Sequence, residues 1–423
     1  MPLLLLFGCV LSVRPLSQDY SELPPEQALD AALETLSQVY SLSAHKELDW
    51  TVLSEQVQEE ANLEQSLRAL TLAMPDGHVL LEHEDPERLK CAQIGGSLAL
   101  TFSDSEQGVV VVSSQMAEVE PGDVLLSWQG LSVDEALQVQ PLQCFPVGLA
   151  TQDKRAAARV RLLSLAEVGS EIALELEGGA GVYQVALPAL EHDLPAHAVL
   201  GLHTPEDMVS HRMLSPEIGY LRIGWEESVL SERRVRSALS QLYRDGARSL
   251  VLDLRDNDGG TDMAAANIVG LFTQEAFFYE TITMYDRRSE GQVDISEVWV
   301  QPQELYWSLP VVVLVNDNTV SSGEGIAMGL QSLGIPIMGL SGTAASFGST
   351  GSTTRFPDGW TLTWPAGLSL DAAGEIQLDS DASGVGGVAP DLWIPWTVEN
   401  RVAYAADREG FEIAQAQAWL EAQ

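Results

Sequence analysis

The spacing of apolar residues changes along the chain, and this change predicts separate parts. From Pro25 to Leu72 apolar residues recur with helical periodicity, which predicts a small helical region. From about Gly95 the pattern shifts to short β-rich runs such as SLALTF and GVVVVSS, with turn residues between them. The first half of the chain is therefore expected to hold a helical region followed by a separate β-rich module.

Beyond Ile218 strands and helices alternate. The strand candidates are GYLRIGW, SLVLDLR, VVVLVN and IPIMGL, and each is nearly continuous in apolar residues. Helices are expected at about Ser231 to Arg244, after Gly260, and at about Gly323 to Leu333. This pattern is typical of an α/β layer fold whose central strands are covered on both faces. Reactive groups in such folds gather where strands end and helices begin.

Length and charge limit the class of protein. A chain of 423 residues with 45% hydrophobic content can bury more than one core, so several domains are expected. The 61 acidic and 22 basic residues leave a net charge of −39, and such a surface would be repelled by phosphates. Nucleic acid and anionic membranes are therefore excluded as partners.

The amino terminus predicts export. Met1 to Val13 is a short apolar run followed by polar residues, as in an export signal, although it lacks a basic start. The run Leu6 to Cys9 resembles a bacterial lipoprotein box, in which Cys9 would be lipidated. We expect an exported protein, periplasmic or extracellular, with a lipid anchor as the alternative. No other segment is apolar enough to span a membrane.

The cysteines leave two interpretations open. Cys9, Cys91 and Cys144 are too few and too scattered for a zinc site or a disulfide framework. Cys91 and Cys144 either form one bridge or remain buried thiols.

The run VVVLVNDNTVSSGEGIAMGL puts Ser321 after a buried strand and at the start of a helix. A hydroxyl there lies in an exposed turn, near backbone N–H groups and the positive helix end, which stabilise a developing oxyanion. The alternative is an ordinary helix cap, with Glu324 three residues beyond Ser321 as a capping box. Local sequence alone favours the cap.

A second run, SLVLDLRDNDGGTDMAA, also ends a buried strand with polar residues and paired glycines. Gly259 and Gly260 allow a turn with an outward N–H, as an oxyanion hole requires. The alternatives are a tight turn, or a metal loop built on Asp253, Asp256 and Asp258. A calcium loop of the EF-hand type does not fit the sequence.

Together the two runs resemble the carboxy-terminal processing, or tail-specific, protease family. The family hallmarks are an LDLR-N-x-GG turn and a later T-x-S-x-x-E turn, which correspond here to Leu252–Gly260 and Thr319–Glu324. The first serine of the second turn is the family nucleophile, so the resemblance implies that Ser321 fills this role. It further implies that the backbone N–H groups of Gly260 and Ser322 form the oxyanion hole.

Other segments extend the resemblance over most of the chain. Lys46 to Trp50 is similar to the family's amino-terminal helical signature, and Gly95 to Leu187 to its PDZ-type module. Phe356 to Gly359 and Gly387 to Asp391 resemble its carboxy-terminal end. The fold so implied is a multidomain α/β protein with a helical region, a PDZ-like β-rich module and a crotonase-like layered protease core. The expected ranges are 1–22 for the leader, 23–92 for the helical region carrying His78, 93–190 for the PDZ-like module, 200–400 for the protease core and 401–423 for a carboxy-terminal helix.

The general base departs from the commonest family pattern. Many bacterial members use a lysine in a TFGKG motif, but this chain has SFGST there, with Ser349 in the place of the lysine. No lysine follows Lys154, so a lysine from the protease core is excluded. The tricorn-like branch instead uses a histidine, and MPDGHVLL resembles its motif and offers His78. A histidine can take the serine proton near neutral pH and return it to the leaving amine.

The third member of the triad is expected in IQLDSDASGVGGVAPD. The family has a glutamate just before its GVxPD end, and this chain offers Asp379 first and Asp381 second. The resemblance thus implies a serine endopeptidase that acts near the ends of extended polypeptides without a metal or organic cofactor. Two rivals remain: a binding protein that has kept the fold, as the family's retinoid-binding member suggests, and an acyl hydrolase that is not a peptidase.

Overall fold

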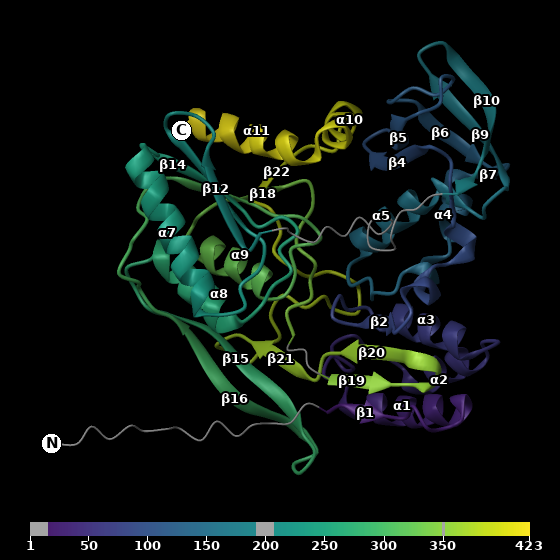
Figure 1. The fold of residues 1–423 in the computed structure, drawn as a ribbon, viewed down its shortest axis with the longest axis horizontal. Helices are drawn as coiled ribbons and strands as arrows, with labels where there is room; N and C mark the ends of the chain where they lie inside the picture. Colours follow the sequence, from purple (N-terminus) through teal and green to yellow (C-terminus); the bar gives the residue numbers. More distant parts are fainter. Residues whose placement is uncertain (1–15, 192–206, 349–351) are drawn as a thin grey trace.

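The computed structural model describes residues 16–191, 207–348 and 352–423. The chain begins with three helices, continues through a β-rich module, and ends in a large mixed α/β part (Figure 1). Residues 1–15, which include Cys9 and most of the expected leader, lie outside the described residues, as does Ser349. None of the helices in the described ranges has both the length and the hydropathy needed to cross a bilayer.

The amino-terminal helices are α1 (Pro25–Val39), α2 (Trp50–Gln58) and α3 (Leu63–Ala73). Local caps fix two of them: the Asp49 side chain accepts the first N–H groups of α2, and the Asn62 side chain accepts an N–H of α3. Their apolar faces do not form a core of their own. They pack on a sheet that joins chain segments far apart in sequence, in the order β1-β19-β20-β2.

That sheet pairs two strands from the amino-terminal region with two strands from residues 352–364. Its strands are β1 (Gln18–Asp19), β2 (Leu80–His83), β19 (Ser352–Arg355) and β20 (Trp360–Trp364). Leu16 is buried and Gln18 pairs with Thr354, so residues 16–22 belong to the folded chain. These residues fall within the range 1–22 expected for the leader, whose first 15 residues lie outside the described part of the chain.

The β-rich module has its own hydrophobic core. Its main sheet runs β10-β9-β6-β5-β4, so β4 is an edge strand. The strands are β3 (Gly96–Ser97), β4 (Leu100–Ser105), β5 (Gly108–Ser114), β6 (Val124–Trp128), β7 (Leu131–Ser132), β8 (Leu165–Ala166), β9 (Glu171–Gly178), β10 (Gly181–Pro188) and β11 (Leu190–Glu191), and the helices are α4 (Val133–Gln138) and α5 (Gln152–Leu162). A disulfide joins Cys91 to Cys144, with their Cα atoms 5.5 Å apart, and thus decides between the two interpretations of these cysteines.

The core sheet runs β12-β13-β14-β17-β18-β22, and β13 to β22 are parallel. Side chains of successive residues along β14 and β17 belong to two different hydrophobic clusters, because neighbouring strand residues point to opposite faces. The helices α7, α8 and α9 cover one face, and α11 covers the other (Figure 1). The strands are β12 (Val209–Met213), β13 (Ile218–Ile223), β14 (Ser249–Asp253), β17 (Val311–Leu314), β18 (Ile337–Gly339) and β22 (Leu392–Trp393).

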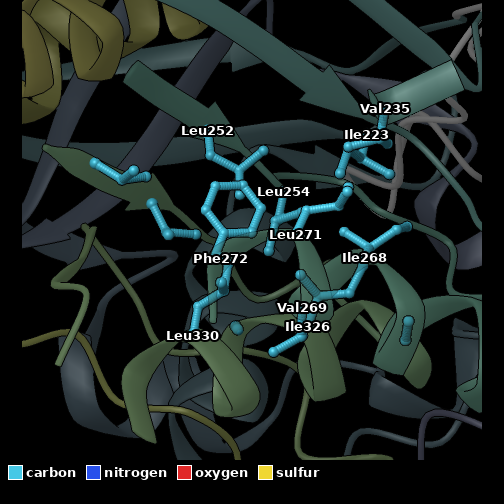
Figure 2. Close-up of a cluster of buried hydrophobic side chains, with 14 of the residues drawn as sticks. Ile223, Val235, Leu252, Leu254, Ile268, Val269, Leu271, Phe272, Ile326 and Leu330 are labelled. Atoms are coloured by element: carbon cyan, nitrogen blue, oxygen red, sulfur yellow. The ribbon is translucent and has the colours of Figure 1, made fainter. Parts of the chain in front are cut away.

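The helices of this part begin close to where the sequence predicted them. They are α7 (Val229–Asp245), α8 (Asp262–Val269), α9 (Ser322–Ser332), α10 (Val398–Ala406) and α11 (Arg408–Glu421). Figure 2 shows part of the larger cluster, in which Leu252 and Leu254 from the β14 segment lie in the same core as Ile326 and Leu330 of α9. The single carboxy-terminal helix expected at 401–423 is instead two helices, because Asp407 ends α10 and its side chain caps α11.

A further sheet, β16-β15-β21, extends from the core. Its strands are β15 (Phe277–Asp286), β16 (Gly291–Val300) and β21 (Gly367–Leu370). Short 3₁₀ helices complete the described elements: η1 (Pro86–Leu89), η2 (Ala92–Ile94), η3 (Leu142–Cys144), η4 (Gly270–Phe272) and η5 (Pro357–Gly359).

Candidate functional site

Ser321 lies between the buried strand β17 and the first turn of α9. Its φ of 58° is in the left-handed region, which a residue other than glycine adopts only when its surroundings hold it there. The backbone N–H of Ser321 donates to the carbonyl of Ser346 (3.0 Å) and to Oε2 of Glu324 (3.3 Å). The tight turn therefore presents this serine in a fixed orientation.

Glu324 is buried and acts as the hub of the turn. Its Oε1 accepts hydrogen bonds from Thr343 Oγ1 (2.5 Å) and from the N–H of Ala345 (2.8 Å). Its Oε2 accepts the N–H of Ser346 (2.9 Å) in addition to that of Ser321. Burial raises the pKa of Glu324 to about 7, against the opposing effect of these donors. The glutamate thus holds the turn as well as capping α9.

The glycine turn after β14 lies directly against Ser321. A Cβ on Gly259, whose φ is +79°, would lie 2.7 Å from Cβ of Ser321. A Cβ on Gly260 would lie 2.1 Å from the carbonyl oxygen of Glu226. Only glycine fits at either position. Within the described residues no hydrogen-bond acceptor is found for the backbone N–H of Gly260 or for that of Ser322.

Two carboxylates of the possible metal loop are already ion-paired. Asp253 contacts Arg255 at 2.7 Å, and Asp256 contacts Arg408 at 2.8 Å. Asp258 points elsewhere and lines the pocket described below. The sequence therefore forms a βα turn here whose carboxylates are divided between different partners.

His78 lies in the loop between α3 and β2. Its backbone N–H donates to Oδ1 of Asp76 (2.7 Å), and its ring Nδ1 lies 3.6 Å from the same oxygen. The side chain is only 9% exposed, and neither ring nitrogen has a hydrogen-bond partner among the described residues. Burial lowers the pKa of His78, while Asp76 opposes that shift. The ring is therefore neutral near pH 7 and has an unused lone pair.

A single pocket of about 620 Å³ brings the two predicted residues together. It is formed by the loop before β2, the segment after β13, the glycine turn and the turn that carries Ser321. Its lining residues are Gly77, His78, Leu80, Trp225, Glu227, Asp258, Gly259, Gly260, Val320, Ser321 and Thr363. The core sheet and the amino-terminal region each supply one wall, so neither forms the pocket alone.

Ser346 joins the two walls. Its Oγ accepts the N–H of Gly77 (2.7 Å), the residue before His78, and its carbonyl accepts the N–H of Ser321. Asp379 supports the same turn, since its Oδ1 accepts the N–H groups of Phe347 (2.9 Å) and Gly348. A single short turn thus fixes the loop of His78 relative to Ser321.

The two aspartates expected to orient His78 lie in different surroundings. Asp379 is buried, and burial and the neighbouring Asp76 raise the pKa of its carboxyl well above the usual range. Asp381 is exposed, and its Oδ1 accepts the N–H groups of Ser383 and Val385 in a surface loop. Neither comes within 4.0 Å of the His78 ring. Asp76 is the only carboxylate in the described part of the chain that does.

The described lysines lie outside the pocket lining. Lys46 is buried and donates to Oγ of Ser380 (2.6 Å), and burial lowers its pKa. Lys154 donates to the carbonyl of Asp317 (2.7 Å). These contacts agree with the sequence argument against a lysine base.

Several residues of the site were missed from the sequence. Asp76 and Ser346 were not assigned a role, although Asp76 lies within the MPDGHVLL run and Ser346 begins the SFGST run. Glu226 is buried, its Oε1 accepts from Oγ of Ser322 (2.6 Å), and burial raises its pKa to about 7. No sequence pattern pointed to it, because its role depends on pairing across the sheet edge.

A second cavity of about 550 Å³ lies between the β-rich module and the core. The edge strand β4 and the helix α5 form one side, and loops of the core and of α10 form the other. The carboxy-terminal part reaches across it, since Arg401 Nε donates to the carbonyl of Asp104 (2.9 Å) and Glu106 N donates to the carbonyl of Trp396 (2.9 Å).

Parts of the chain are similar to known proteases and to a peptidase family model. Residues 217–394 match the model of peptidase family S41. The chain is 27% identical over 329 residues to the carboxyl-terminal-processing protease of Picosynechococcus sp., covering 75% of this chain and 72% of the relative. It is 28% identical over 209 residues to the carboxy-terminal processing protease CtpA of Bacillus subtilis, covering 49% and 40%.

Among solved structures, mature CPAF complexed with lactacystin superposes with a TM-score of 0.63. The match covers 93% of this chain and 98% of that one, at 14% sequence identity. At this identity the likeness concerns the fold. It extends over nearly the whole chain, including the helical region and the β-rich module.

Proposed function

The chain is a serine-type peptidase of the carboxy-terminal processing protease family, and we propose that it cleaves extended polypeptides with Ser321 as nucleophile and His78 as base. The observation that carries this proposal is the pocket that holds Ser321, His78 and Gly260 together. Each of these residues comes from a different segment of the chain. A serine hydroxyl is a weak nucleophile without a neighbouring base, and His78 is the titratable nitrogen in the pocket.

The reaction proceeds as an acyl transfer. Oγ of Ser321 attacks the scissile carbonyl while His78 takes its proton, and the carbonyl oxygen gains the negative charge. The N–H groups of Gly260 and Ser322 bind that oxygen, and His78 then gives the proton to the leaving amine. Water next attacks the acyl-enzyme with His78 again as base, releasing the acid and restoring Ser321.

Asp76 is the carboxylate that we assign to the base. Its Oδ1 already holds the His78 backbone and lies 3.6 Å from Nδ1. A small rotation of the ring would complete a hydrogen bond to Nδ1 and leave Nε2 for the serine proton. Asp379 has a different role in this proposal, because it supports the turn that carries Ser346.

The β-rich module is assigned to substrate capture. Its PDZ-like character, inferred from sequence, gains support from the cavity between the edge strand β4 and α5. An extended peptide can add to such an edge through main-chain hydrogen bonds. The contacts of Arg401 and Trp396 with this edge imply that the peptide must displace or pass the carboxy-terminal segment.

Export is likewise part of the proposal. The disulfide between Cys91 and Cys144 supports an oxidising compartment, because such bonds are rare in reducing cytosol. Mass spectrometry of the native protein under non-reducing conditions would detect the bridge. A pair of free thiols would remove this support.

A fluorophosphonate probe followed by peptide mapping tests the central claim. Wild-type protein should be labelled at Ser321 alone, and Ser321→Ala should lose both labelling and hydrolysis of casein. Ser322→Ala is the matched control, because it removes only an Oγ that is buried against Glu226 and keeps the backbone N–H that we assign to the oxyanion hole. That control should keep the label at Ser321. A folded wild-type sample without any label would favour the rival, a binding protein that has kept the fold.

A further inference from the structure

The walls of the Ser321 pocket carry negative charge. Glu227 and Asp258 both line it, and no lysine or arginine does. Neither carboxylate has a hydrogen bond or an ion pair within the ranges 16–191, 207–348 and 352–423. The nearby Arg222 is directed at Asp256, 3.7 Å from its Oδ2. Two unpaired carboxylates therefore face the space where substrate must bind.

Both carboxylates are held by the backbone of the oxyanion turn. Asp258 immediately precedes Gly259, which abuts Ser321. The backbone N–H of Asp258 donates to the carbonyl of Gly224 (2.9 Å). Glu227 follows Glu226, whose N–H and carbonyl pair with this turn. The backbone contacts therefore place both residues beside the glycine turn, where a side chain next to the scissile bond would meet their carboxylates.

An unused polar group in the same pocket also points to a bound ligand. His78 is buried to nine-tenths, faces the pocket, and has no partner for either ring nitrogen. A neutral apolar occupant would leave the carboxylates of Glu227 and Asp258 unpaired and partly desolvated, which is costly. A cationic occupant would pair with them and be drawn in by the surrounding negative field.

We propose that Glu227 and Asp258 form a subsite for a lysine or arginine side chain adjacent to the scissile bond. This proposal rests on the peptidase function proposed above and adds its substrate class: polypeptides cut beside a basic residue. Asp258 makes the closer contact, because it is attached directly to the turn that touches Ser321. Both residues are exposed to solvent and accessible to a substrate side chain.

The test uses fluorogenic peptides identical except for one position next to the cleaved bond, which is lysine, norleucine or glutamate. Norleucine keeps most of the lysine chain without its charge. Wild-type enzyme should cleave the lysine peptide with a kcat/KM about tenfold above that of the norleucine peptide, the scale of one partly desolvated charge pair. The glutamate peptide should be the poorest substrate.

Variants distinguish an effect of the pocket carboxylates on the lysine-to-norleucine ratio of kcat/KM from an effect of the chain's overall negative charge. Asp258→Asn and Glu227→Gln should each lower the lysine-to-norleucine ratio, with the larger loss in Asp258→Asn. Asp258→Lys should invert the preference toward glutamate. Glu399→Gln removes an exposed carboxylate on α10, outside the pocket, and should leave the ratio unchanged.

The possible failures can be told apart. If wild-type protein takes the fluorophosphonate label at Ser321 but cleaves the lysine and norleucine peptides equally, the subsite is refuted and the peptidase function stands. The same holds if Glu399→Gln lowers the ratio as much as Asp258→Asn. If folded wild-type protein takes no label, the peptidase proposal fails and the subsite fails with it.

Discussion

The two walls of the Ser321 pocket are built in opposite ways. The nucleophile wall continues a buried parallel sheet, and four donors converge on Glu324 to hold its turn. The base wall is a loop in which His78 has one backbone bond to Asp76 and two unpaired ring nitrogens. The first wall resists change because many bonds specify it. In the second wall the backbone of the loop is held by Asp76 and Ser346, but the ring of His78 is not, which suits the proposed base.

Removing the base should have the largest effect. We expect His78→Ala to lower kcat/KM by roughly 10⁴-fold or more and to abolish labelling, as for other serine triads. The free energy of unfolding should change by less than about 1 kcal/mol, because no hydrogen bond of the ring is lost. Peptide hydrolysis and thermal unfolding measure the two effects. His211→Ala, an exposed histidine outside the pocket, serves as control. Activity retained above one hundredth would contradict the assignment.

Asparagine variants of Asp76, Asp379 and Asp381 should show which carboxylate orients the ring of His78, because their effects on kcat should differ. We expect Asp76→Asn to lower kcat by about 10³-fold, because the amide favours the wrong ring tautomer of His78. Asp379→Asn should act more weakly on kcat but reduce thermal stability, since it loosens the turn at Phe347. Asp381→Asn should change neither. The reverse order for Asp76 and Asp379 would return the orienting role to Asp379.

The oxyanion turn should tolerate no side chain. In Gly260→Val the new Cβ would collide with the carbonyl oxygen of Glu226, so the turn must move and its N–H with it. The acylation rate should fall by about a hundredfold, the scale of one lost oxyanion donor. Gly179→Val, at a hairpin with open space around it, is the control. Unchanged single-turnover acylation in Gly260→Val would mean that the oxyanion binds elsewhere.

The stability of the nucleophile wall can be measured through Glu324. Glu324→Ala leaves several buried donors without an acceptor, each worth about 1 to 3 kcal/mol, so we expect a loss of roughly 3 kcal/mol or more. Urea unfolding of this variant beside His78→Ala compares the two walls directly. A smaller loss of unfolding free energy in Glu324→Ala than in His78→Ala would show that the wall with Ser321 is not the more firmly held of the two.

The smallest expected effect is a shift in pH dependence. His78 must be neutral to act, and burial lowers its pKa, so the acidic limb of kcat/KM should lie below the ordinary histidine value of about 6.5. The acidic limb can be located by measuring kcat/KM for an uncharged peptide substrate between about pH 4 and pH 8, a range that spans the histidine titration. A limb at alkaline pH would contradict the assignment of His78 as the base.

The free energy of unfolding should also depend on pH. The titration of His78 and the titrations of Glu324 and Glu226 should change it in opposite directions. Below about pH 6.5 the unfolded chain binds a proton at His78 that the folded chain resists, so this group destabilises the fold as pH falls. Burial raises the pKa of Glu324 and Glu226 to about 7, so the folded chain binds protons there that the unfolded chain has lost. Their contribution favours folding at low pH and is lost as pH rises through about 7.

Much of the nucleophile wall was determined by sequence alone. Continuous apolar strands on β14 and β17 specified a sheet buried on both faces, and the glycines and serines after them specified turns at its carboxyl edge. Those features are local: strand, turn and helix cap act over a few residues. The resemblance to carboxy-terminal processing proteases rests on the same two runs, and the comparisons support it with a match of residues 217–394 to peptidase family S41.

Tertiary structure alone decided which groups share the pocket. Ser346 and Glu226 act through bonds across large sequence separations, such as Gly77 N to Ser346 Oγ, whereas Asp76 contacts His78 two residues away. The sequence left Asp379 and Asp381 open, and only folding buried one and exposed the other. The amino-terminal helices likewise lack a core until β19 and β20 return to them. Periodicity encodes which face of an element is buried, but packing between distant segments decides what that face meets.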